Sequence, residues 1–142
     1  MAFTGNYMCT SFKVALLNGE MDFSSDTSQS FKIALYTSDA TLNAETTAYS
    51  TTNEVSGTGY TAGGNTLTIA TNPTNDTSST VAYLDFSDTT WASSSITARG
   101  ALIYKAGGTT PIQKFTKKKN GQPKPVGFLI NPLKKNLKNK AS

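Results

Sequence analysis

The residues with the most pronounced chemistry in this sequence are lysines in its C-terminal quarter. Nine lysines lie between Lys114 and Lys140, a stretch of twenty-seven residues that contains no carboxylate and no arginine. Lysine attracts anions as a point charge and lacks the bidentate fork of arginine, so the attraction should be strong, unspecific and sensitive to salt. This pattern predicts contacts with a polyanion or with an acidic protein surface.

The same stretch contains an apolar cluster and several prolines. Residues 126–130 read VGFLI and suit a strand added to an exposed sheet edge, while the prolines favour an extended chain over a helix. We therefore predict an extended basic C-terminal arm that binds a partner. The alternative is a solvated tail that only keeps the protein soluble. The predicted partner-binding residues are Lys114, Lys117, Lys118, Lys119, Lys124, Val126, Phe128, Ile130, Lys134, Lys135, Lys138 and Lys140.

Charge divides the chain into two unequal parts. Residues 1–104 hold three cations against nine carboxylates, a net charge of −6, whereas residues 105–142 hold ten lysines and no acid, a net charge of +10. The modest total of +4 therefore conceals an acidic body joined to a basic tail. Such asymmetry points to a polyanionic partner.

The sequence lacks histidine, the residue that many catalytic and metal sites use, and has a single cysteine. It has no histidine, so the usual zinc sites and a serine–histidine nucleophile cannot be assembled. A serine–lysine pair stays open, although Lys13 and Lys32 sit in patterns typical of solvated side chains. The single cysteine, Cys9, cannot form an intrachain disulfide and is expected to be a small buried apolar residue. We predict no catalytic residue, no metal site, no cofactor and no enzymatic activity.

Two weaker patterns have structural explanations. The run GTGYTA at residues 57–62 fits the dinucleotide pattern G-x-G-x-x-A, but Gly63 and Gly64 follow at once and exclude the helix that this pattern needs. We predict a glycine-rich connection between strands instead. Asp85 and Asp88 could share a cation, but no third ligand is near in sequence, so we expect them to end a strand and accept bonds from turn N–H groups.

The aromatic residues and the single arginine each allow two interpretations. A platform for a sugar or a nucleobase is one, but aromatic residues of β-rich domains usually pack in the core and across strands, which is what we expect. Arg99 is expected to close an ion pair with Asp85 or Asp88 rather than bind a ligand. The candidate platform residues are Trp91, Tyr49, Tyr60, Tyr83 and Tyr104.

A β-rich body must position these side chains. The run TSFKVALLNGEMDF predicts a helix at about residues 10–18, capped by Thr10 or Ser11 and ended by Gly19, with Phe12, Ala15 and Leu16 on its buried face. Residues 31–37 alternate as a half-buried strand does, and short β-type runs separated by turn residues continue to position 104. These features predict a mainly β fold, an antiparallel β-sandwich of Ig-like or jelly-roll type with one short N-terminal helix.

Length and composition set the domain organisation. A chain of 142 residues is long enough for one packed core, and its character changes abruptly at the run KAGGTTP. We predict a β-sandwich domain at residues 1–106 and an extended lysine-rich tail at residues 107–142. No run approaches the ~20 apolar residues of a membrane span, and the N-terminal residues do not resemble a signal peptide, so we expect a soluble protein with no membrane partner.

Residues 10–104 also carry a resemblance to a known family. The relevant runs are TSFKVALLNGEMDF, FKIALYTSDATLNAETTAYSTTNEVSGTGYTAGGNTLT and TWASSSITARGALIY. Their order and wording resemble a family of small, mostly uncharacterised virion structural proteins of tailed bacteriophages. The resemblance implies a β-rich protein without enzymatic activity that is made in the host bacterial cytoplasm and built into the virion in many copies.

The C-terminal part departs from this family. Its members continue with further β-type, acid-containing sequence after the equivalent of ALIY, whereas this chain turns to lysine, proline and asparagine. Either the tail replaces the last strands or a change of reading frame produces the lysine-rich ending. If the last strands are missing, the sheet has an open edge that favours pairing with another subunit.

These observations together predict a capsid decoration or cement protein. Its β body would sit on or between copies of the major capsid protein, and its basic C-terminal arm would tie neighbours together in a symmetric homo-oligomeric assembly. One alternative is a tail-associated or fibre-associated protein that presents aromatic residues such as Trp91 to a host glycan. A second alternative is a nucleic-acid-binding protein whose lysine tail contacts packaged DNA.

Overall fold

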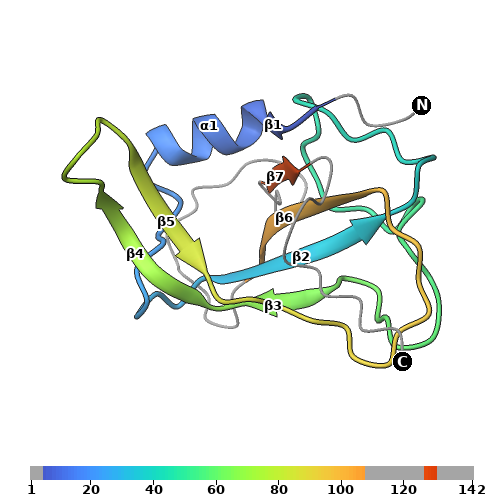
Figure 1. The fold of residues 1–142 in the computed structure, drawn as a ribbon. Coiled ribbons are helices and arrows are strands. Elements are labelled where there is room, and N and C mark those ends of the chain that lie inside the picture. The colour runs from blue at the N-terminus through green and yellow to red at the C-terminus, as the bar shows by residue number, and fades with distance from the viewer. Residues whose placement is uncertain (1–4, 108–126, 131–142) are drawn as a thin grey trace.

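The computed structural model of the chain describes residues 5–107 and 127–130, and this part of the protein is mainly β with antiparallel strand pairing. Five strands form the main sheet in the order β1-β7-β6-β2-β3, and β4 pairs with β5 in a separate two-stranded hairpin (Figure 1). The mainly β prediction is confirmed. The elements are β1 Tyr7–Met8, α1 Thr10–Leu17, β2 Ser30–Tyr36, β3 Asn65–Leu67, β4 Ile69–Asn75, β5 Ala82–Phe86, β6 Gly100–Ala106 and β7 Gly127–Ile130.

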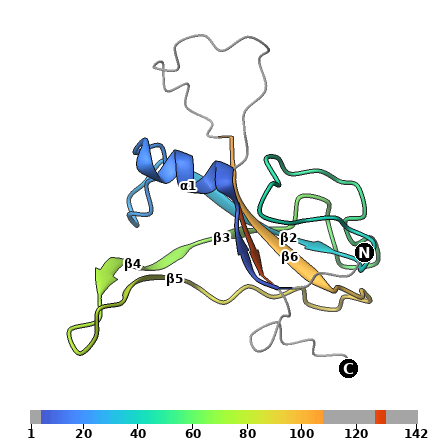
Figure 2. The same cartoon turned by 90° about the horizontal axis from the view of Figure 1, so that it is seen from above.

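Strands β2 and β6 form the centre of the main sheet. They pair over seven residues, from Ser30 opposite Ala106 to Tyr36 opposite Gly100. The sequence pattern predicts burial of one face of β2 only, yet its last four residues are all buried. The second face is buried because the segment that follows β2, residues 37–64, folds back over it, on the side opposite α1 (Figure 2).

Helix α1 covers the first face of the sheet. Phe12 and Ala15 are buried there, and the ring of Phe23 stacks on that of Phe31 with 4.7 Å between the centroids. The predicted helix at about residues 10–18 is confirmed, but Leu16 is largely exposed, contrary to the expected face. Cys9, not Thr10 or Ser11, is the N-cap residue and makes no side-chain capping bond, whereas Gly19 ends the helix with φ +67° as expected.

The second face packs a smaller core. The buried residues Ala34 and Tyr36 from β2 lie there with Leu102 and Tyr104 from β6. Tyr49, from the segment that covers this face, stacks on Tyr104 with 4.7 Å between ring centroids. This covering segment is irregular. The β-type run AYSTTNEV at residues 48–55 forms no strand, and an isolated bridge joins Tyr36 and Glu54 there.

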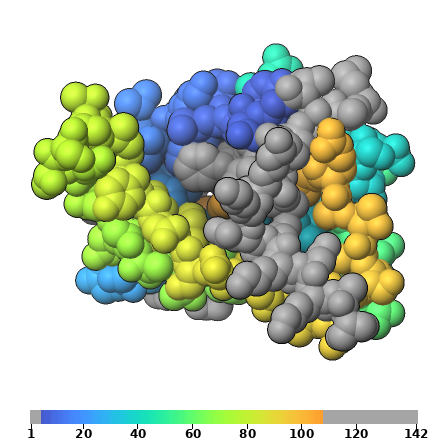
Figure 3. Space-filling model, in the orientation of Figure 1, coloured from blue at the N-terminus to red at the C-terminus, as the bar shows by residue number. Residues whose placement is uncertain are grey.

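The β4–β5 hairpin projects from one end of the main sheet (Figures 1 and 3). The single strand that the run NTLTIAT predicts is divided into β3 and β4 at Thr68, whose carbonyl accepts a bond of 2.8 Å from the N–H of Ser87. Ile69, Leu84 and Phe86 anchor the base of the hairpin against the first core. Its distal half extends beyond that support.

Two glycines with almost the same positive φ differ in how closely other atoms approach them, and one of them directly precedes β3. Gly64 has φ +68°, and a Cβ there would collide with the carbonyl of Ile33, whereas Gly19 has φ +67° and nothing within 4 Å. We expect Gly64→Ala to lower the free energy of unfolding by at least about 3 kcal/mol, because backbone strain and collision add. Gly19→Ala should lose only about 1 kcal/mol, the penalty of the left-handed conformation alone. Urea unfolding of both variants measures the difference, and equal losses would show that the close approach at Gly64 does not exist.

Candidate partner-binding surface

Of the twelve predicted partner-binding residues, Phe128 and Ile130 lie within a described strand, β7. The structure describes the backbone of this strand and its pairing. The other predicted residues lie outside the described part of the chain and stay predictions. They are Lys114, Lys117, Lys118, Lys119, Lys124, Val126, Lys134, Lys135, Lys138 and Lys140.

Strand β7 inserts into the chain's own sheet. It pairs with β6, from Ala101 opposite Ile130 to Tyr104 opposite Gly127, and on its other side Tyr7 of β1 lies opposite Leu129. The apolar run was expected to add a strand to an exposed sheet edge, and the structure shows this addition within the same molecule. No pattern in the sequence indicates that the acceptor strand is β6.

This pairing fixes the points at which the two lysine-rich segments join the main sheet. Strands β6 and β7 are antiparallel neighbours, so residues 107–126, with five lysines, connect two points on one sheet. Residues 131–142, with four lysines, follow β7, and twelve residues reach at most about 40 Å when fully extended. The two basic segments therefore meet at β7, a strand of the main sheet, in place of the single uninterrupted tail that the sequence predicts at residues 107–142.

Helix α1 presents an apolar surface away from the core. Val14 is half exposed and Leu17 is 88% exposed. Met8, in the short edge strand β1 that leads into the helix, is also largely exposed. Large apolar side chains grouped in this way favour contact with another molecule.

The outer face of the β4–β5 hairpin is a second such surface. Val81 is 55% exposed and Tyr83 is 48% exposed. Asp85 is exposed on the same face, because every second residue of a strand points to the same side. At the turn, the carboxylate of Asp76 accepts bonds from the N–H and the hydroxyl of Ser78, which lower its pKa. The outer face of this strand therefore combines exposed apolar atoms with a carboxylate.

Most of the candidate aromatic platform is part of the core. Trp91 is only 9% exposed and its ring stacks on that of Tyr60, while Tyr49 stacks on Tyr104. Only Tyr83 is open to a ligand. Within the described part of the chain, the Trp91 indole N–H is buried and has no hydrogen-bond partner. Core packing, as expected, explains all but one of these rings.

A carboxylate that the sequence analysis did not single out organises the segment over the second face. Glu54 accepts hydrogen bonds from the hydroxyl of Tyr49 at 2.5 Å, the hydroxyl of Tyr60 at 2.7 Å and the N–H of Gly63 at 2.7 Å. The hydroxyl of Tyr60 also accepts a bond from the N–H of Leu35, a residue of β2, at 2.8 Å. Through these bonds one side chain ties the irregular segment to the central strand.

The environment keeps these tyrosines in the neutral form. Burial, followed by the negative charge of Glu54, raises the pKa of Tyr36, Tyr49 and Tyr104 above the ordinary value. The pKa of Tyr60 is raised too, by burial and by its bond to Glu54, although the N–H of Leu35 opposes the shift. Neutral phenols that donate to a carboxylate stabilise the fold and supply no nucleophile.

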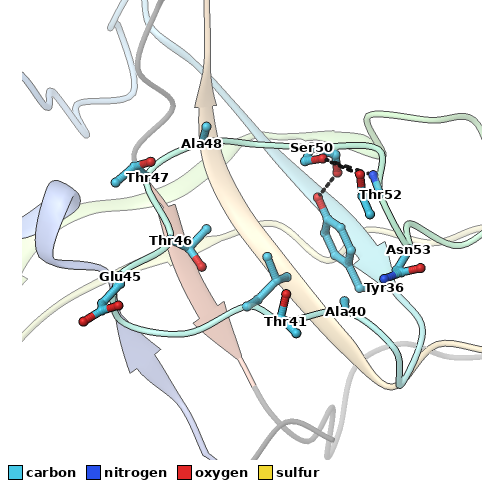
Figure 4. Close-up of a pocket in the computed structure, with 11 residues that line it drawn as sticks. Tyr36, Ala40, Thr41, Glu45, Thr46, Thr47, Ala48, Ser50, Thr52 and Asn53 are labelled. Atoms are coloured by element: carbon cyan, nitrogen blue, oxygen red, sulfur yellow. Dashed lines mark hydrogen bonds between the residues drawn. The ribbon is translucent and has the colours of Figure 1, made fainter. Parts of the chain in front are cut away.

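A hollow of about 310 Å³ opens in the segment that covers the second face (Figure 4). Hydroxyl groups line much of it, including those of Thr41, Thr47 and Thr52, while the hydroxyl of Tyr36 is engaged by the carbonyl of Ser50 at 2.7 Å. Among the described residues that line it, Glu45 is the only ionisable one apart from Tyr36. The hollow offers neutral polar contacts and no convergent acid–base pair.

Among the described residues, no group of three or more histidine, cysteine or acidic side chains is placed to hold a metal ion. No helix in this part is long and apolar enough to cross a membrane. Cys9 is fully buried, as expected, and its thiol donates to the carbonyl of Asn43 at 3.7 Å. The glycine-rich run at residues 57–62 is an irregular connection with no helix after it, also as expected.

Comparison with protein-family models, with curated proteins and with solved structures finds no match to this chain.

The carboxylate of Glu54 should be essential for stability. Replacing it in Glu54→Ala leaves two phenol hydroxyls and one N–H without their acceptor, so the free energy of unfolding should fall by about 2–4 kcal/mol. Glu45→Ala removes an exposed carboxylate from the same segment and should change it by less than about 0.5 kcal/mol. Urea titration of both variants measures this, and similar values for the two would contradict the assigned network.

Alkaline pH should unfold the protein. Since the folded-state pKa of each buried tyrosine lies above the ordinary value of about 10, its contribution is fully present below pH 10 and is lost as pH rises further. Each group should remove about 1.4 kcal/mol per pH unit. Lys105 opposes this trend: burial lowers its pKa in the folded state, so its contribution to stability rises with pH.

The measurement for this prediction is a series of urea midpoints from neutral pH to about pH 11, with tyrosinate absorbance followed in parallel. Tyr49→Phe should make the decline shallower by one proton because it removes one of the titrating groups. A stability that stays constant across this range would contradict the assignment.

Proposed function

We propose that this chain is a non-enzymatic structural protein of a phage virion, most simply a capsid decoration or cement protein. In this proposal the β body is a sandwich, with the main sheet as one layer and the β4–β5 hairpin as part of the second. The body sits on copies of the major capsid protein, and the lysine-rich segments bind acidic patches of neighbouring subunits. The protein is made in the bacterial cytoplasm and ends up in the virion.

One observation carries the proposal: the basic segments are joined to an acidic body by a strand that belongs to the main sheet. Residues 1–104 have a net charge of −6 and residues 105–142 one of +10, and β7 pairs with β6 over four residues in the middle of the basic part. Lysine-rich segments that precede and follow a strand of the folded body suit attachment to a fixed surface. A repeating acidic surface supplies such contacts many times over.

The energetics suit a multivalent shell. A single exposed lysine–carboxylate contact contributes only about 0–1 kcal/mol, so one copy would bind weakly by charge alone. The exposed apolar side chains of α1 and β5 add surface that becomes buried on contact. Repetition across a symmetric shell multiplies such contacts. The resemblance of residues 10–104 to phage virion proteins supports the same conclusion.

Two other functions compete with this one. Nucleic-acid binding rests on the nine lysines without a carboxylate between Lys114 and Lys140, which suit phosphates equally well. A host-glycan role in a tail or fibre draws less support, because Trp91 is buried and Tyr83 is the exposed aromatic of the original set.

The test is co-sedimentation of the full chain with empty capsids, with DNA-filled capsids and with naked duplex DNA across a salt series. We expect saturable binding to both capsid types at a symmetry-matched copy number, weakening as salt rises. Replacing Lys134, Lys135, Lys138 and Lys140 by glutamine should weaken capsid binding by about tenfold or more, since four charge contacts are lost. Such replacements keep β7 in place, which truncation before it would not.

The matched control replaces Lys114, Lys117, Lys118 and Lys119 by glutamine, so the two basic segments are compared at equal charge loss. Retention on naked DNA with indifference to empty shells would refute the decoration role and assign the lysines to nucleic acid.

A further inference from the structure

The outer face of the β4–β5 hairpin has the features of a docking surface. Leu84 and Phe86 turn toward the core, so Val81, Tyr83 and Asp85 alternate with them on the opposite face. Thr74 lies opposite Tyr83, and all these outer residues are exposed. An isolated two-stranded hairpin is marginally stable in water, so the distal half would gain from a partner that covers it.

Charge indicates what that partner is. Residues 69–88 contain Asp76, Asp85 and Asp88 and no cation. Residues 131–142 of this chain contain four lysines and no acid, with Leu133 and Leu137 between them. The segment is thus complementary to the hairpin face in charge and in apolar character. Its leucines can pack against the exposed Val81 and Tyr83, and its lysines can pair with the carboxylates.

The distal half of the hairpin of the same molecule is out of reach for Leu133. Ile130 lies opposite Ala101, which lies opposite Leu35, whereas the hairpin leaves the sheet beyond Leu67, opposite Phe31. These are opposite ends of β2, and the hairpin points away from the end where β7 finishes (Figure 2).

Distances along the chain make the same point. The five residues of β2 from Leu35 to Phe31 and the length of β4 together span on the order of 30 Å. Leu133 lies three residues beyond Ile130, which allows about 10 Å and falls well short, whereas Leu137 lies seven beyond, which allows about 25 Å. Both leucines together can therefore cover the distal half of the hairpin only on another molecule.

We propose that residues 131–142 of one copy bind the outer face of the β4–β5 hairpin of a second copy. The contact is heterologous, because each molecule offers its C-terminal segment to one neighbour and its hairpin to another. It closes into a ring or continues along a surface. This inference rests on the proposed structural role and names the partner of four of the lysines.

The experiment is sedimentation equilibrium of the full chain and of two variants. One carries Val81→Ser and Tyr83→Ser and loses the hairpin face, and the other carries Leu133→Ser and Leu137→Ser and loses the C-terminal contact. We expect concentration-dependent self-association of the unmodified protein, weakened by salt, and an increase of about tenfold or more in Kd for each variant. An equimolar mixture of the two variants should form dimers and nothing larger, because only one type of junction survives.

The control is Leu17→Ser, which removes an apolar side chain of α1 that is more exposed than Val81 or Tyr83. It should self-associate as the unmodified protein does, and far-ultraviolet circular dichroism checks that every variant is folded. The inference is overturned if the unmodified protein stays monomeric, if either double variant associates normally, if Leu17→Ser weakens association as much as they do, or if the mixture stays monomeric.

The two proposals fail separately. Capsid binding without self-association would refute only the contact between copies. Self-association without capsid binding would refute only the decoration role.

Discussion

Burial of both faces of β2 is the constraint on which the rest of the molecule depends. A strand that exposes one face needs a single layer of cover, but Ile33 and Leu35 point into one core while Ala34 and Tyr36 point into another. Helix α1 and the base of the hairpin cover the first face with regular structure. The second face is covered by an irregular segment, which lacks a ladder of backbone bonds and depends on side chains instead. The three bonds to Glu54 meet that need, and they use tyrosines that also fill the core.

The integration of β7 changes how the basic part of the chain must be understood. β7 pairs with β6, so each lysine-rich segment is joined covalently to a strand of the acidic body. Residues 1–104 have a net charge of −6 and residues 105–142 one of +10. Opposite charges attract, so the carboxylates of the body compete with an external partner for the lysines. An external partner must therefore offer more than scattered carboxylates, and repeated apolar contacts are the natural addition.

Sequence patterns within a few residues predicted the features that such short-range patterns determine. Helix α1, its termination at Gly19, the core residues Phe31 and Leu35 and the burial of Cys9 all follow from periodicity and residue type. The covering segment did not, because Glu54 is an ordinary polar residue in sequence and gains its role only when Tyr49, Tyr60 and Gly63 meet around it. The placement of β7 beside β6 was equally hidden: four residues can pair with any open edge, and only the assembled sheet selects one. The outer face of β5 was available in the alternation of VAYLDF, but its exposure required knowledge of where the hairpin projects.

The single tryptophan occupies a place that makes it informative in another way. Trp91 lies in the core against Tyr60, and Tyr60 in turn bridges Glu54 and the backbone of β2. The protein thus contains one indole fluorophore, shielded from water and in contact with the polar network that fastens the covering segment. Its emission reports on that junction alone, without interference from a second indole. Loosening of the segment would admit water to the ring and move the emission toward the red, so the molecule carries a built-in optical reporter of its least regular part.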